Sequence, residues 1–420
     1  MTSTPGHPER IEDVDIFDPA TMENWYPTYD LLREQCPVYE VPGKNQFFVT
    51  RYDDLTAVLR DTTLFRRGGG SAAVLMKNPE ATRIYEEKGW PRWQPLATEP
   101  PLHRRYRELV DPWFSVAGSE TRRPLITGLG NDLLDAWIDD GEVEYVSQFA
   151  LPLPVAVITL LLGFPLSDIE QLKEWSEAWV MPFAGGLAPD DEIHVAEKGV
   201  EFQHYIAGTI AEKRRKPGDD VISHLTTAMF DDPAGRPRAL TDHEIIGIID
   251  HLYIGGNETT TFALTSGLWL LVRHPEVEAA LRADPSLVRR FVDEVVRLES
   301  PTQGLYRQVA ADTELHGCPI PKGAAVHLRY AAANRDPRAF PDPTSIDLAR
   351  PNGHRHVAFS LGETHCPGAG LSRLEQTIAT EAILRRIQNI TFAPARNDFS
   401  HHRNFTLRAL KELHIEFDRI

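Results

Sequence analysis

The chain has 420 residues, 42% of them hydrophobic and 25% charged, and its formal net charge is −17. This composition is typical of a globular protein with a large core and excludes a disordered or fibrous chain. The acidic balance argues against a nucleic-acid partner, because phosphate binding needs a basic surface. No flexible linker divides the sequence, so we expect one domain over residues 1–420, with a disordered tail at about residues 1–15.

The longest apolar stretch, Phe149 to Phe164, contains two prolines and is shorter than the roughly 18 residues of a membrane helix. The N-terminal residues lack the apolar core of a signal sequence. Cys36, Cys318 and Cys366 are too few and too scattered for a disulfide framework. We therefore expect a cytoplasmic protein with no membrane segment, and we expect a monomer.

Helical periodicity dominates the chain. Apolar residues recur at spacings of three and four in four segments: Tyr29 to Gln35, Arg123 to Asp139, Asp168 to Val180 and Leu287 to Leu298. Shorter alternating segments predict strands at Val38 to Val41, Phe47 to Thr50, Glu314 to Leu315, Ala325 to Leu328 and Leu413 to Phe417. The predicted fold class is therefore mainly α with a small β portion.

Two long connections, residues 66–98 and 181–191, are candidate lids over a pocket. Their apolar side chains indicate that the pocket binds an apolar molecule. Those side chains are Ala72 to Met76, Trp90, Trp93, Leu96, Met181 and Phe183.

The longest predicted helix begins after Thr241 and ends at His274, before a proline. Thr241 and Glu244 have the spacing of a capping box, in which each side chain accepts a hydrogen bond from the other residue's backbone. The helix contains Gly255-Gly256, although each glycine inside a helix costs about 1 kcal/mol relative to alanine. The missing side chains must therefore leave space that a neighbour or a ligand needs.

Cys366 lies in a glycine-containing loop, Phe359 to Gly368, before a predicted helix from Leu371 to Ile387. Backbone N–H groups and the helix dipole favour a thiolate at such a position, so the cysteine is suited to bind iron. The glycines allow the backbone to approach a flat cofactor closely. No second cysteine or histidine pair has the spacing of a zinc site.

This loop resembles the haem-binding signature of the cytochrome P450 superfamily, at Phe359, Gly362, Cys366 and Gly368. The resemblance is to the soluble, bacterial type of haem-thiolate monooxygenase. It implies that Cys366 is the axial ligand to the iron of haem b, and that the other three residues contact the cofactor.

Two positions depart from the signature. Ser360 stands where the family has glycine, and Thr364 stands where a histidine or arginine contacts a haem propionate. His365 is the next residue along, but neighbouring side chains point in different directions. The partner of that propionate therefore stays open.

Glu294 and Arg297 lie three residues apart on one predicted helix face, where a carboxylate and a guanidinium meet. Such pairs are also common on solvated helices. With Arg350, however, they resemble the family's structural triad. The resemblance implies a buried network that supports the cysteine loop and is needed for folding or haem retention.

The segment Gly255 to Thr260 resembles the family's distal-helix signature, in which Glu258 and Thr259 are the catalytic acid and hydroxyl. The resemblance implies that the two residues relay protons for cleavage of the O–O bond, while Gly255 leaves room for dioxygen beside the haem. A hydrogen bond from the threonine hydroxyl back into the helix predicts a local bulge.

His251 precedes Gly255 by four residues and so shares its helix face. We predict that His251, Ile254 and Gly255 line the substrate pocket. A histidine satisfied in the core is the alternative interpretation for His251.

His103 and Arg107 lie four residues apart, on one face of a predicted helix. By resemblance they bind a haem propionate, and Arg307 is the third propionate ligand. Arg104 and Arg105 form either a solvated basic face or part of a surface that receives an acidic ferredoxin.

The resemblance extends from about Asp18 to Phe417 and implies a mainly α prism, with haem b between the Thr241 to His274 helix and the cysteine loop. It also implies a monooxygenase that inserts one atom of O2 into a C–H bond of a small apolar substrate, such as a terpenoid, steroid or aromatic molecule. Electrons would come from NAD(P)H through a separate ferredoxin reductase and ferredoxin, since no reductase domain follows Ile420.

Two alternatives stay open. A peroxide-driven peroxygenase is disfavoured by the Glu258-Thr259 pair, because direct use of peroxide does not require this proton relay. A non-catalytic haem-thiolate sensor or carrier would bind haem without turnover.

Overall fold

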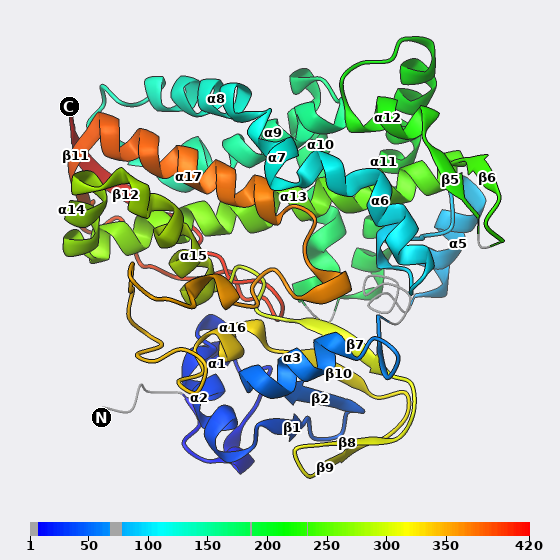
Figure 1. Ribbon diagram of the computed structural model, residues 1–420, viewed down its shortest axis with the longest axis horizontal. Coiled ribbons are helices and arrows are strands. Elements are labelled where there is room, and N and C mark those ends of the chain that lie inside the picture. The colour runs from blue at the N-terminus through cyan, green and yellow to red at the C-terminus, as the bar shows by residue number, and fades with distance from the viewer. Residues whose placement is uncertain (1–6, 68–77, 185–186, 233) are drawn as a thin grey trace.

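A computed structural model describes residues 7–67, 78–184, 187–232 and 234–420 of the chain. Helices form the larger part of the molecule, and a five-stranded sheet packs with α1, α2, α3 and α16 in the smaller part (Figure 1). The predicted mainly α class with a small β portion is confirmed.

The helices of the larger part surround the long central helix α13 (Figure 1). The α-helices in the described parts of the chain are α1 (Pro19–Glu23), α2 (Tyr26–Gln35), α3 (Tyr52–Arg60), α5 (Pro79–Lys88), α6 (Leu102–Phe114), α7 (Val116–Glu120), α8 (Arg123–Asp135), α9 (Pro152–Leu162), α10 (Ile169–Val180), α11 (Pro189–Arg215), α12 (Val221–Thr227), α13 (Asp242–Arg273), α14 (Pro275–Ala283), α15 (Val288–Glu299), α16 (Tyr330–Asn334) and α17 (Ala369–Arg386).

The strands form one larger sheet and three small ones. They are β1 (Val38–Glu40), β2 (Gln46–Val49), β3 (Phe65–Arg66), β4 (Glu142–Glu144), β5 (Met229–Asp231), β6 (Pro237–Ala239), β7 (Leu305–Val309), β8 (Thr313–Leu315), β9 (Cys318–Ile320), β10 (Ala325–Leu328), β11 (Ile387–Phe392) and β12 (His414–Arg419).

The larger sheet has the strand order β1-β2-β10-β7-β3. β2 and β10 are parallel, with Ala325 opposite Gln46, and the other pairs are antiparallel. The remaining sheets are β11-β12-β4, β5-β6 and β8-β9. All five predicted strand segments are found, and the segment Ala325–Leu328 has the predicted bounds.

The central helix α13 is buried on several sides, because it packs against α9, α11, α15 and α17. Its isoleucines Ile245, Ile246, Ile248 and Ile249 are at most 1% exposed. A helix that is apolar around its whole circumference belongs inside a core, and this burial explains the apolar sequence.

The predicted start of α13 is confirmed. The backbone N–H of Thr241 donates to Glu244 Oε2 over 2.7 Å, and the backbone N–H of Glu244 donates to Thr241 Oγ1 over 3.2 Å. Glu244 also accepts from the hydroxyl of Tyr106 in α6 over 2.6 Å. Glu244 therefore fixes the start of α13 against α6, the helix that carries His103 and Arg107.

Two predicted boundaries are wrong. The helix that starts at Arg123 ends at Asp135, not at Asp139, because residues 136–140 form the turns that lead into β4. In the described part of the expected N-terminal tail, Ile11–Asp13 form a 3-10 turn and Val14 is buried beside Trp25. Disorder over the whole of residues 1–15 is thus contradicted.

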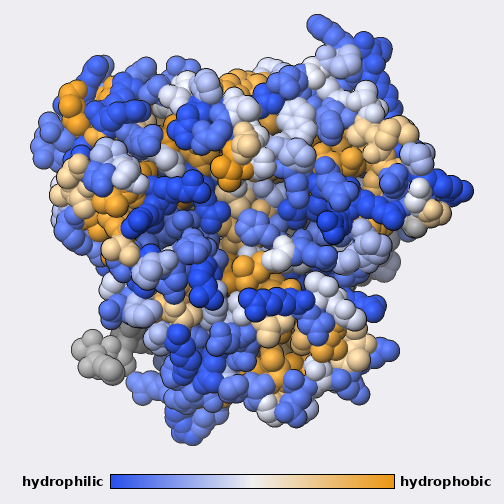
Figure 2. Space-filling view, in the orientation of Figure 1, coloured by the Kyte–Doolittle hydropathy of each residue, from blue (hydrophilic) through white to orange (hydrophobic). Residues whose placement is uncertain are grey.

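The surface facing the viewer in Figure 2 is mostly hydrophilic, with hydrophobic residues scattered among the polar ones. Among the described residues, no helix is long and apolar enough to cross a membrane.

Candidate active site

The cysteine loop runs from Phe359 to the start of α17. The backbone N–H of Cys366 donates to the carbonyl of Phe359 over 2.8 Å and closes the loop. Gly362 has a φ of 61°, and Ser360 has a φ of 60°, so both occupy the left-handed region that favours glycine. A Cβ added to Gly368 would lie 3.8 Å from the sulfur of Cys366, so this glycine keeps the space beside the sulfur open.

Cys366 is half-buried and carries a free thiol. Burial raises the pKa of this thiol, while the backbone N–H of Gly368 and the guanidinium of Arg107 act in the opposite direction. The predicted position of the sulfur, just before the N-terminus of α17, is where backbone N–H groups favour a thiolate.

A polar network that the sequence did not indicate lies behind the loop. Arg373 of α17 donates from Nε to Asp293 Oδ1 of α15 over 2.7 Å, and its guanidinium carbon lies 4.5 Å from the ring centre of Phe359. His356 Nε2 lies 3.2 Å from Arg373 Nη2 and 3.5 Å from Asp293 Oδ1. Although burial opposes it, contact with His356 and Arg373 lowers the pKa of Asp293 to about 2. The ion pair with Asp293 therefore holds the guanidinium of Arg373 against the ring of Phe359.

The structure brings Glu294, Arg297 and Arg350 together. Arg297 Nε and Nη2 donate to the two oxygens of Glu294 over 2.7 and 2.8 Å, and Arg350 Nε lies 3.2 Å from each of them. Nη1 of Arg297 donates to the carbonyl of Pro343 and Nη1 of Arg350 to the carbonyl of Pro341, over 2.6 Å each, and further donors of both arginines reach the carbonyl of Ser345. The carboxylate thus links α15 to the chain that precedes the cysteine loop.

The glycine pair of α13 serves two different purposes. A Cβ at Gly256 would lie 2.9 Å from the side chain of Ile158, so Gly256 permits close packing of α13 on α9. A Cβ at Gly255 would meet no atom within 4 Å, and this residue is exposed although it lies in the middle of a buried helix. Gly255 therefore faces open space inside the molecule.

Thr259 lies on the same side of α13 as Gly255. Its hydroxyl donates to the carbonyl of Gly255 over 3.1 Å, as expected from the sequence. The prediction of a bulge at this point is wrong, because α13 is α-helical from Asp242 to Arg273. The hydroxyl shares the carbonyl with the regular helix ladder and does not displace it.

Glu258 is half-buried, and among the described residues no cation forms a salt bridge with it. Burial and the nearby Glu177 raise the pKa of Glu258 to about 7. This carboxyl group therefore exchanges a proton near neutral pH, which suits a general acid.

His251 and Ile254 have different surroundings. His251 is half-buried, and within the described part of the chain its Nδ1 has no hydrogen-bond partner. Burial together with Arg67 and Arg107 lowers its pKa to about 4. Ile254 is 6% exposed and belongs to the main apolar core. One turn along α13, Asp250 accepts a hydrogen bond from Trp179 Nε1 over 2.9 Å, and burial raises its pKa to about 6.

The predicted propionate ligands lie on one side of the site. His103 is 2% exposed, and its Nε2 is buried without a hydrogen-bond partner among the residues that the structure describes. Burial with Arg67 and Arg107 lowers its pKa to about 3. Arg107 pairs with Asp111 over 2.5 Å and donates to the carbonyl of His365 over 2.8 Å. Arg67 and Arg107 therefore make the surroundings of His103 rich in positive charge.

Thr364 takes the place of a charged side chain in the loop. Its hydroxyl accepts from Arg307 Nη2 over 3.1 Å and lies 2.8 Å from the hydroxyl of Ser360. The two departures from the signature, Ser360 and Thr364, are therefore bonded to each other and position Arg307.

The residues present fit haem. The site offers a sulfur ligand and an open turn of α13. Among the described residues, it also offers a buried nitrogen of His103 without a hydrogen-bond partner, beside the like charges of Arg67 and Arg107. A flat cofactor with an iron atom and two carboxylates would satisfy each of these groups. Among the described residues, no cluster of three or more His, Cys, Asp and Glu side chains has the arrangement of another metal site.

Comparisons with known proteins agree with this geometry. A family model described as Cytochrome P450 matches residues 194–391. Cytochrome P450 107B1 of Saccharopolyspora erythraea is 32% identical over 96% of this chain and 97% of its own length. Cytochrome P450 monooxygenase PikC of Streptomyces venezuelae is 32% identical over 94% of this chain and 91% of its own length. The chain belongs to the cytochrome P450 family.

Solved structures of cytochromes P450 have the same fold. The structure of Cytochrome P450 CYP109Q5 from Chondromyces apiculatus has a TM-score of 0.85 at 30% identity and covers 98% of this chain and 99% of its own. P450BioI was solved in complex with an acyl carrier protein ligated to hexadec-9Z-enoic acid. It has a TM-score of 0.84 at 30% identity, and the match covers 95% of this chain and 100% of its own. This cytochrome P450 is a monooxygenase that uses haem b and O2 to oxidise an organic substrate.

The predicted lids of this cytochrome P450 are only partly described. Ala72 to Met76 and the side chain of Phe183 lie outside the described residues. Trp90 packs against His204 of α11 and Trp93 packs against His243 of α13, with the ring centres 5.4 Å apart in each pair. Both tryptophans also pack against the main apolar core, so they fix this connection to the helices, and an apolar pocket beneath it stays a prediction.

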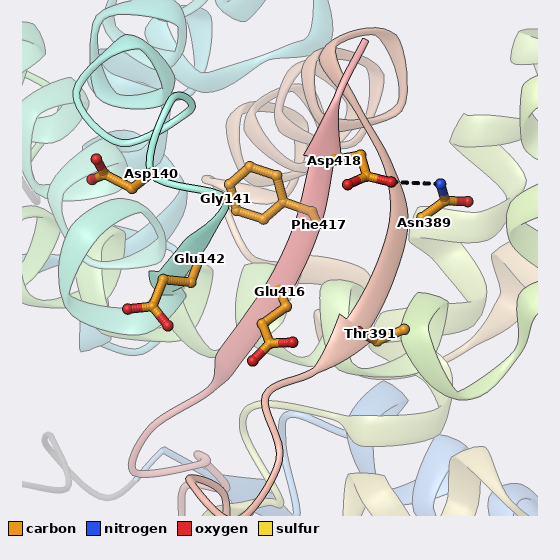
Figure 3. Close-up of a pocket in the computed structure, with 8 residues that line it drawn as sticks. All are labelled: Asp140, Gly141, Glu142, Asn389, Thr391, Glu416, Phe417 and Asp418. Carbon is orange, nitrogen blue, oxygen red and sulfur yellow. Dashed lines mark hydrogen bonds between the residues drawn. The ribbon is translucent and has the colours of Figure 1, made fainter.

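A surface groove of about 430 Å³ lies on the β4-β11-β12 sheet and not at the haem site (Figure 3). Glu142, Glu416 and Asp418 lie along it, and Asp418 accepts a hydrogen bond from Asn389 over 2.7 Å. None of the predicted site residues lines this groove.

Proposed function

We propose that Cys366 is the thiolate ligand to the haem iron, and that the enzyme inserts one atom of O2 into a C–H bond of a small apolar substrate, such as a terpenoid, steroid or aromatic molecule. One observation carries the proposal. The cysteine precedes α17, and a hydrogen bond of 3.1 Å between Thr260 of α13 and Ser372 of α17 holds this helix beside the open turn at Gly255.

The haem iron supplies the activation of O2 when the cofactor is bound. Glu258 and Thr259 supply protons, because the carboxyl group of Glu258 exchanges a proton near pH 7 and the hydroxyl of Thr259 both donates and accepts. The hydroxyl of Thr259 donates to the carbonyl of Gly255 in this structure. Its oxygen can therefore still accept a hydrogen bond from a proton donor in the open space at Gly255.

The loop network has a supporting role in this proposal. One network joins Glu294 to Arg297 and Arg350, and the other joins Asp293 to Arg373. They hold the segments on either side of Cys366. We propose that both networks keep the sulfur in place and retain haem.

Relatives give the chemistry a context. 6-deoxyerythronolide B hydroxylase of Saccharopolyspora erythraea is 31% identical over 96% of this chain, and its name describes a hydroxylation. The acyl carrier protein complex of P450BioI contains a fatty acid. The proposed substrate of the present enzyme is likewise an organic molecule with unactivated C–H bonds.

We further propose that a ferredoxin, reduced by a ferredoxin reductase with NAD(P)H, delivers the electrons. Arg104 of α6 supports a docking role because its side chain is 77% exposed. Arg105 does not, because its guanidinium donates to the backbone carbonyls of Asp231 and Asp232. The three free thiols support a reducing compartment, and we propose the cytoplasm.

The test is a reconstituted assay with NADPH, ferredoxin reductase, ferredoxin and ¹⁸O2. Candidate substrates are first chosen by the change in visible absorption that accompanies displacement of iron-bound water. We expect one labelled oxygen atom in the product. Product made at the same rate from hydrogen peroxide alone, with its oxygen from the peroxide and not from ¹⁸O2, would instead support a peroxygenase. Saturable binding without any product would support a sensor or carrier.

A further inference from the structure

Arg67 directly follows β3 at the end of the larger sheet, and it lies near enough to Arg307 for that arginine to lower its pKa. β3 and β7 are antiparallel, with Phe65 opposite Val309 and Arg66 opposite Gln308. The next step of this register places Arg67 across from Arg307. Opposed residues of an antiparallel pair have Cβ atoms about 5 Å apart, so two like charges are adjacent here.

Neither guanidinium has a carboxylate partner among the described residues. Arg67 Nη1 donates to the carbonyl of Leu96 over 2.6 Å, and Arg307 donates from Nη1 to the carbonyl of Tyr306 and from Nη2 to the hydroxyl of Thr364. The carboxylate of Glu99 is near, but it accepts from the backbone N–H of Arg67 over 2.7 Å. Both positive charges thus lack a direct counter-charge.

Burial makes this arrangement unfavourable unless an anion is present. Arg307 is 6% exposed and Arg67 is half-buried. Burial, Arg307 and Arg107 together lower the pKa of Arg67 to about 10. A buried charge without a partner is costly, so this pair indicates that a negative group binds between or beside the two arginines.

The position of the pair identifies the anion. Arg307 is bonded to Thr364, two residues before Cys366, and His103 with its unpartnered Nε2 lies near enough to Arg67 for the arginine to lower its pKa. At 364, a histidine or arginine would have offered a cation to a haem propionate, and threonine offers none.

We propose that Arg67 binds a haem propionate and supplies the positive charge that Thr364 lacks. Thr364 then acts indirectly, by holding Arg307 beside Arg67. The proposal rests on haem binding at Cys366, as proposed above.

The alternative is that Arg67 only braces the turn at Leu96. The test compares R67Q with R66Q, a matched control that removes the same charge from the neighbouring residue of β3. Arg66 is exposed, and its Nε donates only to the carbonyl of Thr63 over 3.3 Å. R67K keeps the charge but loses the planar donor.

Two readouts are made on the haem-loaded enzymes: the rate of haem transfer to excess apomyoglobin, and the propionate bending bands in resonance Raman spectra. We expect R67Q to lose haem about tenfold faster than the wild type, the size expected for a hydrogen bond to a charged group, and its bending bands to shift. R67K should lose haem more slowly than R67Q, and R66Q should match the wild type in both readouts.

Bending bands of R67Q that equal those of the wild type would overturn the proposal, even if haem were lost faster, because a bracing role does not touch the propionate. Equal effects of R66Q and R67Q would also overturn it. If R67Q retains too little haem for spectra, unchanged bands in R67K decide against the proposal. The carbon monoxide spectrum of the wild type tests Cys366 separately, so failure of the ligand assignment is distinguishable from failure at Arg67.

Discussion

Polar groups on the two sides of the haem site differ in how completely they are satisfied. On the cysteine side, Glu294 accepts from two arginines, and Asp293 accepts from Arg373. On the α13 side, among the described residues, Glu258 has no cation partner and His251 Nδ1 has no hydrogen-bond partner. Asp293, Glu258 and His251 are all half-buried, so burial alone does not explain the contrast.

The difference separates support from chemistry. A buried charge with every oxygen paired has a fixed proton content and a fixed position, which stabilises the loop that carries the sulfur. A buried carboxyl group without a partner has a pKa near neutrality and is free to exchange a proton. The following changes test this division.

Loss of Glu294 should have the largest effect. Glu294→Ala leaves Arg297 and Arg350 buried without a counter-charge, which costs about 3 to 5 kcal/mol. We expect little haem-loaded protein, measured as the ratio of haem absorbance to protein absorbance, and a lower midpoint of chemical unfolding.

Glu120→Ala is a matched control for this loss. Glu120 and Arg123 also lie three residues apart with a 2.7 Å contact, but their side chains are 48% and 41% exposed, against 2% and 0% for Glu294 and Arg297. An exposed pair contributes at most about 1 kcal/mol. Normal haem content and stability in Glu294→Ala would contradict a supporting role for the triad.

Replacement of Glu258 should change the pH dependence of stability. Its pKa rises from 4.5 to about 7 on folding, so the folded protein holds a proton that the unfolded chain releases between these values. Wild-type stability relative to Glu258→Gln is therefore highest below pH 4.5 and falls as the pH rises to 7, by up to about 3 kcal/mol at 1.36 kcal/mol per pH unit.

Unfolding by urea at pH 5 and pH 8 checks this sign. We expect Glu258→Gln to gain relative to the wild type at pH 8, and its product yield per O2 consumed to fall. A stability difference that is the same at both pH values would show that the carboxyl group does not titrate in this range.

Removal of the Thr259 hydroxyl should uncouple the reaction. We expect Thr259→Ala to form at least about tenfold less product per O2 consumed, because a positioned proton donor contributes a factor of this size or more. Oxygen uptake and product are measured in the same reconstituted assay.

Thr265→Ala is the control, since its hydroxyl makes the same bond to a carbonyl four residues earlier, over 2.9 Å, but is 2% exposed. Equal coupling in both variants would assign the effect to the helix and not to the open side of Thr259.

Changes at Ser360 should have the smallest effect. Its φ of 60° favours glycine by about 1 kcal/mol, while its bond to Thr364 contributes a similar amount. Ser360→Gly gains the first and loses the second, so its stability should stay close to that of the wild type. Ser360→Ala keeps the strain and loses the bond, and should unfold about 1 kcal/mol more easily. An alanine variant as stable as the wild type would contradict the contribution of the bond to Thr364, and a glycine variant less stable than the alanine variant would contradict the strain.

Local patterns in the sequence predicted the features that depend on short spacings. The capping box of Thr241 and Glu244, the strand at Ala325–Leu328 and the helix after Cys366 each depend on neighbours a few residues apart. The contact of Thr259 with Gly255 is of the same kind, and only its structural consequence was misjudged.

Features that depend on chain folding could not be predicted. Arg373 meets Asp293 across 80 residues, and Arg67 faces Arg307 only because β3 pairs with β7. The packing of Trp90 and Trp93 likewise depends on where α11 and α13 lie. Arg66 and Arg67 lie far from the cysteine loop in the sequence, and nothing in the sequence distinguished Arg67 from Arg66.

The ligand assignment of Cys366 is tested most directly by the absorption spectrum of the dithionite-reduced protein under carbon monoxide. We expect the red-shifted Soret band of a thiolate-bound haem in the wild type and its loss in Cys366→Ala. A wild-type spectrum without this band, or an unchanged band in Cys366→Ala, would contradict it.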